Sequence, residues 1–199
     1  MLLKEIKNTE GQYTDKDAIY DWLDYVDLKG KYIKVNDDLT VDVYKDVVLT
    51  GANLSSIPIQ FNEVHGCFLC TRNKLTSLRG CPKEVYGDFS ANNNQLQNIN
   101  FLPNYIGGYC GLELNPLLTS FHNIHHYAKV IDDYIFFDKE LVTSHMLGLL
   151  YIKHVDMTVN PDDPEYILII NKYLLREHRD VHACQEELLD AGFPQIAKF

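Results

Sequence analysis

Two groups of side chains near the middle of the chain have spacings that could support metal or redox chemistry. Cys67-x-x-Cys70 has the spacing of a zinc-binding or dithiol pair. On a strand, residues three apart point to opposite faces, so these two thiols would not readily bind one metal. His122-x-x-His125-His126 lacks an acidic or thiolate companion at a recognised spacing. We therefore expect Cys70 in the core, Cys67 at the surface and a polar turn at the histidines.

A third group lies near the C-terminal end. His178-x-x-x-His182 would place two imidazoles on one face of a helix. A zincin needs a glutamate directly after the first histidine to act as base, and Arg179 occupies that position. Cys184 is a candidate nucleophile with either histidine as its base, but a nucleophile inside a helix rarely has an open approach. We expect surface histidines and a core-packed Cys184.

Carboxylates and glycine motifs do not specify a reaction either. The aspartates that could offer ligands to a divalent ion lack calcium-loop spacing; they are Asp132, Asp133, Asp138, Asp162 and Asp163. The sequence contains no G-x-S-x-G, no P-loop and no G-x-G-x-x-G that opens a helix. We therefore expect no catalytic residue, no metal and no cofactor.

The elements that position these residues follow a period of 21 residues. The pattern Val64-x-Gly66-x-Phe68-x-Cys70-x-x-Asn73-x-Leu75-x-x-Leu78 recurs over residues 85–99 and again over residues 106–117. A fixed period of this length is typical of a solenoid, in which each unit stacks on its neighbours. An atypical first unit begins near Val43 and lacks the asparagine, and the pattern breaks after residue 126. We expect about four units over residues 43–126.

The repeat has a family resemblance. Phe68-x-Cys70-x-x-Asn73-x-Leu75 and its two counterparts resemble the L-x-L-x-x-N-x-L core of leucine-rich repeats. The Cys81-Pro82 and Leu102-Pro103 steps before the next unit look like a variant found in uncharacterised bacteriophage proteins. The resemblance implies an α/β fold, namely a short leucine-rich-repeat-like solenoid with one strand per unit. It implies no particular activity.

Strand alternation predicts the inside and the outside of each unit. Residues at one parity should stack in the core, and the asparagines should form a buried ladder at the turn. The expected inward positions are Phe68, Phe89 and Cys110, followed by the ladder of Asn73, Asn94 and Asn115 and by the returning leucines, which include Leu75 and Leu117. The conserved spacing of Gly66 and its counterparts should relieve crowding or permit unusual backbone angles.

The flanking regions should cap the solenoid. In residues 1–42, Thr14 or Asp15 can N-cap a helix that ends at Lys29-Gly30, and two strands follow at 32–35 and 39–43. The apolar stripe of that helix is Ile19, Trp22, Leu23 and Val26. Residues 127–199 should form a mainly helical C-terminal cap or small domain, with helices near 141–152, 166–175 and 180–191. The expected buried positions in these helices are Leu141, Met146, Leu149, Leu150, Leu174, Leu188 and Leu189.

Composition narrows the class of partner. The formal net charge of −10 opposes direct binding to nucleic-acid backbones, which favours Lys and Arg. Five cysteines without a scaffold spacing indicate a reducing compartment. No apolar run has the length of a signal peptide or a membrane span. We expect a cytoplasmic protein, in the host cytosol if it is phage-encoded, with no membrane contact.

These observations favour a non-enzymatic module that binds, and could inhibit, a host or phage protein of unknown identity. The expected contact residues are outward strand positions, where tyrosines, aliphatics and acids suit a partner with apolar and basic features. They are Tyr44, Val48, Cys67, Leu69, Tyr86, Asp88 and Tyr109. Two alternatives stay open: an enzyme with C-terminal chemistry and target-selecting repeats, and a structural or assembly protein of a virion.

Overall fold

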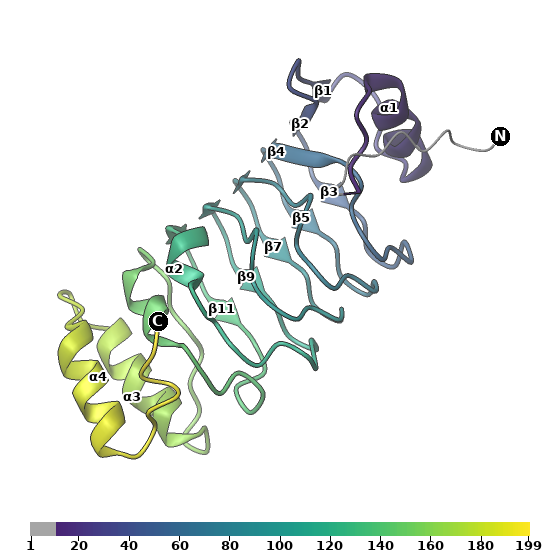
Figure 1. The fold of residues 1–199 in the computed structure, drawn as a ribbon. Coiled ribbons are helices and arrows are strands. Elements are labelled where there is room, and N and C mark those ends of the chain that lie inside the picture. Colours follow the sequence, from purple (N-terminus) through teal and green to yellow (C-terminus); the bar gives the residue numbers. More distant parts are fainter. Residues whose placement is uncertain (1–10) are drawn as a thin grey trace.

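The computed structural model describes residues 11–199, which form an elongated stack of coils with helices at both ends (Figure 1). At the N-terminal end, helix α1 (Lys16–Tyr25) begins after Asp15, whose Oδ1 accepts a hydrogen bond from the Ala18 backbone N–H at 2.8 Å. Ile19, Trp22 and Leu23 of this helix are buried in the core. The Trp22 ring packs edge-on against Phe61, with 6.4 Å between ring centroids. The helix thus covers apolar side chains of the first coils.

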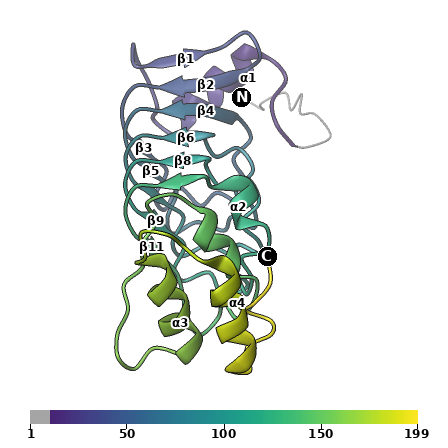
Figure 2. The ribbon, with the colours of Figure 1, turned by 90° about the vertical axis from the view of Figure 1, so that its left-hand side faces the viewer.

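Each of the five coils contributes one short strand to each of two sheets, and the strands of successive coils pair in parallel. The strand pairs are β2 (Thr40–Val43) with β3 (Val47–Val48), β4 (Gln60–Val64) with β5 (Phe68–Leu69), β6 (Glu84–Val85) with β7 (Phe89–Ser90), β8 (Tyr105–Ile106) with β9 (Cys110–Gly111), and β10 (Val130–Ile131) with β11 (Ile135–Phe136). The first sheet has the order β1-β2-β4-β6-β8-β10, in which β1 (Ile33–Val35) runs antiparallel to β2 (Figure 2). The second has the order β11-β9-β7-β5-β3. The chain is therefore a β-solenoid with two strands per coil, and the expected single strand per leucine-rich repeat is wrong.

Equivalent side chains of successive coils stack in the core, as the alternation predicted. Phe68 pairs with Phe89 and Phe89 with Cys110 in the second sheet, and all three are fully buried. The Phe68 and Phe89 rings lie nearly parallel with centroids 5.9 Å apart. Val64 and Val85 form the matching column of the first sheet. The repeat thus buries one continuous core along the solenoid.

The predicted asparagine ladder is present, and it joins consecutive coils. Asn94 Oδ1 accepts a hydrogen bond from the Leu75 N–H of the preceding coil at 3.0 Å. Its Nδ2 donates to the carbonyls of Cys70 in the preceding coil and Ala91 in its own coil, both at 3.0 Å. Asn73 and Asn115 repeat this arrangement one coil away on either side. Each amide therefore satisfies backbone groups of two coils at once.

The repeat extends beyond the expected four units. Strand β10 pairs with β8 and β11 with β9, so residues after 126 form a fifth coil. Ile131 lies opposite Ile106, which is a step of 25 residues, and the additional residues include the short helix α2 (Ile124–Tyr127). The Leu117 position also differs from expectation. Pro116 follows Asn115 in a tight turn closed by the Leu118 N–H, so Leu118 is buried and Leu117 is exposed.

The C-terminal region closes the other end of the stack. Lys153 and Asp156 form isolated bridges with Val130 and Tyr134, which begin a partial sixth coil. The 3₁₀ helix η1 (Leu147–Tyr151) precedes helices α3 (Glu165–Leu174) and α4 (Val181–Asp190), which lie side by side at this end (Figure 1). From Gly11 onward, no helix combines the length and the apolar character that a membrane crossing requires.

Four expectations for this region are wrong. The helix expected over 141–152 is the shorter η1, and Leu141 is exposed. Leu174 and Leu188 are buried, but Leu189 is half-exposed because it lies on the outer side of α4. His178 precedes α4, so it does not share a helical face with His182.

The ladder makes a stability prediction. Asn94→Ala should lower the free energy of unfolding by about 1–3 kcal/mol, because buried backbone groups on two coils lose their partner. Urea unfolding measures the effect, and Gln95→Ala, at an exposed neighbouring position, is the control. Equal stability of the two variants would contradict a structural role for the ladder.

A second prediction concerns the residue before each ladder asparagine, which adopts a left-handed conformation. The φ angles are 54° at Arg72, 56° at Asn93 and 57° at Leu114. Leucine is disfavoured there and asparagine is tolerated, so Leu114→Asn should stabilise the protein by about 0.5–1 kcal/mol. Leu117→Asn removes a similarly exposed leucine whose φ is not positive. A melting-temperature gain in Leu117→Asn as large as in Leu114→Asn would show that the gain does not come from backbone strain.

Candidate binding surface

A column of aromatic rings runs along the outside of the solenoid, at the corner between the two sheets. The Tyr44 and His65 rings stack with centroids 4.7 Å apart and planes 16° from parallel. The His65 and Tyr86 rings stack with centroids 4.7 Å apart and planes 8° from parallel. The Tyr86 and Tyr105 rings are tilted relative to each other, with centroids 5.5 Å apart. We refer to Tyr44, His65, Tyr86 and Tyr105 as the ring column. Its spacing matches the distance of roughly 4.8 Å between neighbouring strands, so the coil stacking itself brings the rings into contact.

The local sequence explains where the column changes. Each of the first three rings directly follows an inward valine, so it points outward at the corner. In the fourth coil this position is Gly107. A Cβ there would lie 2.5 Å from the Tyr86 carbonyl oxygen and 3.3 Å from the Tyr105 hydroxyl. Tyr105, two residues earlier, occupies the space that Gly107 leaves free.

Hydrogen bonds extend the ring column to the last coil. The Tyr105 hydroxyl donates to Asp132 Oδ2 at 2.7 Å, and His154 Nδ1 lies 2.6 Å from Asp132 Oδ1. The hydrogen bond with His154 lowers the pKa of Asp132, and the bond to Asp132 raises the pKa of Tyr105. Tyr86 similarly donates to Glu84 Oε2 at 3.0 Å, which raises its pKa. The rings are thus held in fixed orientations beside carboxylates.

A second column lies beside the rings and is partly structural. Asp46 Oδ1 accepts from the Cys67 N–H of the next coil at 2.8 Å, and Asp88 Oδ1 accepts from the Tyr109 N–H at 3.2 Å. A Cβ at Gly66 would lie 2.3 Å from the Asp46 carboxylate, and at Gly108 the same clash occurs with Asp88. These glycines therefore relieve crowding, and neither has a positive φ.

The structure places the seven expected contact residues on this corner and on the adjoining second sheet. Tyr44, Val48 and Tyr86 are 48, 55 and 45% exposed. The other four are half-buried: Cys67, Leu69, Asp88 and Tyr109. Burial raises the pKa of the Cys67 thiol and of Tyr109, whose ring packs against Phe136. The freely accessible part of the surface is thus centred on the ring column.

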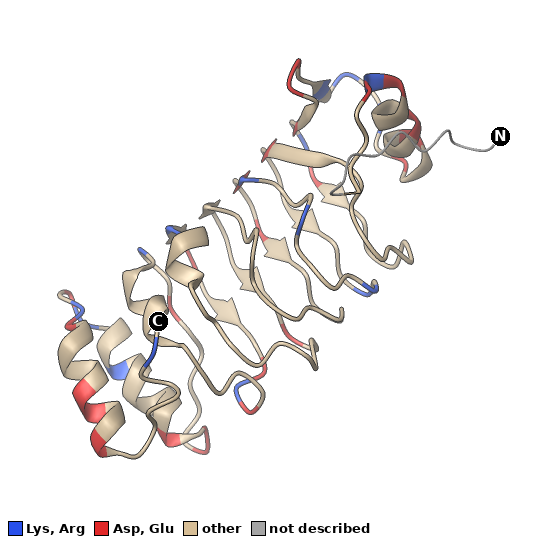
Figure 3. Ribbon diagram, in the orientation of Figure 1, with Lys and Arg blue, Asp and Glu red and all other residues tan. Residues whose placement is uncertain are grey.

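Acidic side chains accompany this surface. Glu63 Oε2 lies 3.4 Å from His65 Nε2, and Glu84 pairs with Glu63 across β4 and β6. Figure 3 shows acidic positions on several successive coils, together with some Lys and Arg positions. Repeated carboxylates next to rings favour a ligand that carries positive charge together with apolar groups.

The candidate chemical groups are not assembled into a metal site. Within residues 11–199, no three His, Cys, Asp or Glu side chains are arranged to hold a metal ion. Cys70 is buried while Cys67 is partly exposed, as the strand alternation predicted. Cys184 is fully buried between helices, and burial raises its pKa to about 12. A thiol in that environment is a poor nucleophile near neutral pH.

Arg179 has a role that the sequence did not reveal. Its Nε donates to the Leu174 carbonyl at 3.1 Å and its Nη2 to the Val155 carbonyl at 2.8 Å, while Nη1 donates to Ile152. The guanidinium therefore joins the end of α3 to the last coil. The sequence signal, an arginine before the N-cap Asp180, is too common to have been recognised.

Comparison with known proteins does not assign the chain to a family. No protein-family model matches it, and no curated protein or solved structure shows a significant match.

The histidines near α2 form a cluster with a different expected property. The His122 and His145 rings are 4.8 Å apart and those of His125 and His126 are 4.2 Å apart, with Lys129 and Lys198 nearby. Burial, followed by neighbouring positive charges, lowers the pKa of His125 and His145. The cluster contacts the C-terminal segment, because the His145 N–H donates to Gln195 and the His122 ring bonds to Phe199.

This cluster predicts acid sensitivity. Because the folded-state pKa values of His125 and His145 lie below the usual 6.5, the unfolded chain binds more protons as the pH falls through 6.5. Stability should be complete above this value and decrease below it. Thermal unfolding between pH 7.5 and 5.5 should show a weaker pH dependence in His145→Gln. His178→Gln, at an exposed position, should behave as the native protein does; a flat native profile would refute the prediction.

Proposed function

We propose that the chain is a non-enzymatic protein-binding module whose contact surface is centred on the ring column and Val48. The observation that carries this proposal is the stacking of three exposed rings at 4.7 Å intervals. Aromatic side chains are the usual energetic anchors of protein interfaces. Rings already fixed by their neighbours lose little conformational entropy when a partner binds.

The chemistry of the surface indicates the kind of partner. Glu63, Glu84 and the Asp88 carboxylate flank the rings, and Val48 and Leu69 add aliphatic area on the second sheet. A protein surface with Lys or Arg side chains and apolar groups would complement both features. The net charge of −10 would also steer such a partner toward the chain.

We also propose that the chain binds its partner in the cytosol of a cell. The bacteriophage-like repeat style and the free cysteines support a role in a reducing cytosol, where binding could inhibit a host or phage protein. A contribution to virion assembly would use the same surface. Catalysis by Cys184 has less support, because its thiol is buried and its pKa is raised to about 12.

The test begins with a photo-crosslinking side chain at position 86, which should capture a partner that position 25 on α1 does not capture. The affinity of that purified partner is then measured for two variants. Tyr44→Ala with Tyr86→Ala should weaken binding by about tenfold or more, while the melting temperature changes little because both side chains are about half exposed.

The matched control is Tyr20→Ala with Tyr25→Ala, which removes two exposed tyrosines from α1. Its affinity should equal that of the native protein. Equal affinity of all three proteins would show that the partner does not bind at the ring column. Turnover of a substrate by the purified protein would refute the non-enzymatic proposal.

A further inference from the structure

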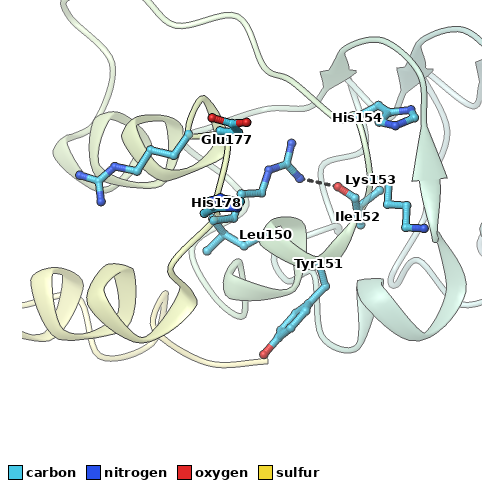
Figure 4. A pocket seen from close by; sticks show the side chains of 9 residues that line it. Leu150, Tyr151, Ile152, Lys153, His154, Glu177 and His178 are labelled. Atoms are coloured by element: carbon cyan, nitrogen blue, oxygen red, sulfur yellow. Dashed lines mark hydrogen bonds between the residues drawn. The ribbon is translucent and has the colours of Figure 1, made fainter.

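A surface pocket lies near the C-terminal end of the stack, between the segment 150–154 and the turn that joins α3 to α4, and its His154 is the residue that bonds to Asp132. Its volume is about 540 Å³, within the range typical of small-molecule sites. Figure 4 shows Glu177 and His178 on the side of the α3–α4 turn and His154 on the side of the last coil. The pocket shares no lining residue with the proposed partner surface.

The lining of this pocket is basic, although the chain as a whole is acidic. Its lining includes the basic side chains of Lys153, Arg176 and Arg179, and Glu177 is the one carboxylate in it. Among the described residues, none of the three cations forms an ion pair. Three positive charges are therefore gathered here in a chain of net charge −10, with Asp156 near Arg179 and Glu187 near Arg176 but beyond ion-pair distance.

Arg179 supplies fixed donors. Its three hydrogen bonds go to neutral carbonyl groups, so they orient the guanidinium without neutralising its charge. A guanidinium has five N–H groups, which leaves two for a ligand. Burial lowers the pKa of Arg179, and the negative charge of nearby Asp156 opposes this shift. An arginine held in this way is suited to the planar, multi-oxygen face of a phosphate.

The other basic groups add adaptable contacts. His154 has a left-handed backbone (φ 63°), and its Nδ1 is held by Asp132, which leaves Nε2 for a ligand. In Figure 4 the Lys153 side chain extends away from Glu177, His178 and Leu150, and its flexible stem would have to turn for the ammonium to reach an anion in the pocket. The Arg176 guanidinium lies 4.1 Å from the Tyr173 ring and contributes charge at the margin.

We propose that this pocket binds a small phosphate-bearing anion, with Arg179 as the oriented donor and Lys153, His154 and His178 as the surrounding cationic or hydrogen-bonding groups. The phosphate could be free or carried by a small organic molecule, since both offer the same oxygens. The inference is independent of the partner surface on the ring column.

Isothermal titration of the full chain with pyrophosphate, inorganic phosphate and AMP, at constant ionic strength, tests the proposal. At least one of the three should bind with a 1:1 stoichiometry. Tighter binding of AMP than of inorganic phosphate identifies an organic phosphate as the ligand class, and the reverse order identifies the free anion. Absence of binding by all three would overturn the proposal, as would a stronger preference for a single-stranded oligonucleotide.

Two charge-reversal variants, one in the pocket and one distant from it, separate a local effect from an effect of net charge. Lys153→Glu should weaken binding of the tightest probe by about tenfold or more, because it replaces a cation of the lining by an anion. Lys74→Glu makes the same change in net charge at an exposed position on a distant coil, and should stay within about twofold of the native affinity. Equal loss in both variants would show that the probe responds only to overall charge. Circular dichroism checks that both variants are folded.

Discussion

The hydrogen bonds of three asparagine side chains, Asn73, Asn94 and Asn115, are the interaction on which the arrangement of the central coils depends. Asn94 bonds to the backbone of its own coil and to that of the preceding coil. This double bonding fixes the distance and the rotation between coils. The left-handed turn before each asparagine, the inward phenylalanine stack and the outward ring column all repeat because that relation repeats. Because one amide per unit sets how neighbouring coils stack, the core and the surface repeat with the same 21-residue period as the sequence.

Much of this arrangement was predictable from the sequence, because the period identified which residues are equivalent. The inward Phe68 and Phe89 follow from alternation, and the buried asparagines follow from the repeat together with the turn that ends each of these strands. The strands that continue the first sheet, β4, β6, β8 and β10, were not anticipated, since three of them are only two residues long and a corner separates them from the expected strands at Phe68, Phe89 and Cys110. The fifth coil was missed because four additional residues around α2 shift Ile131 and Ile135 out of the 21-residue register. No local sequence pattern reveals that four residues are inserted here while the strands that follow still pair with the preceding coil.

The candidate sites, too, could be predicted from the sequence only in part. Tyr44 and Tyr86 could be placed on one surface from the repeat, but their parallel stacking through His65 depends on the coil spacing. The pocket near Arg179 joins residues separated by more than twenty positions and belongs to no repeat. Sequence periodicity reports on what recurs, so it cannot reveal a site that occurs once, at the end of the stack. Acidic positions recur along the coils among some Lys and Arg positions, and the pocket with Lys153, Arg176 and Arg179 in its lining lies near the C-terminal end.

The inter-coil hydrogen bonds have a mechanical consequence. Both the sheet bonds and the asparagine bonds run from one coil to the next, along the axis of the stack (Figure 1). Tension applied between the two ends would load the coil interfaces in series. Each interface has sheet bonds, and the interfaces among the first four coils also have asparagine bonds. The molecule should then lengthen in discrete steps as coils peel away from an end. Each released coil of 21 residues would add roughly 70 Å of extended chain, so the repeat that sets the fold also sets the length of each step.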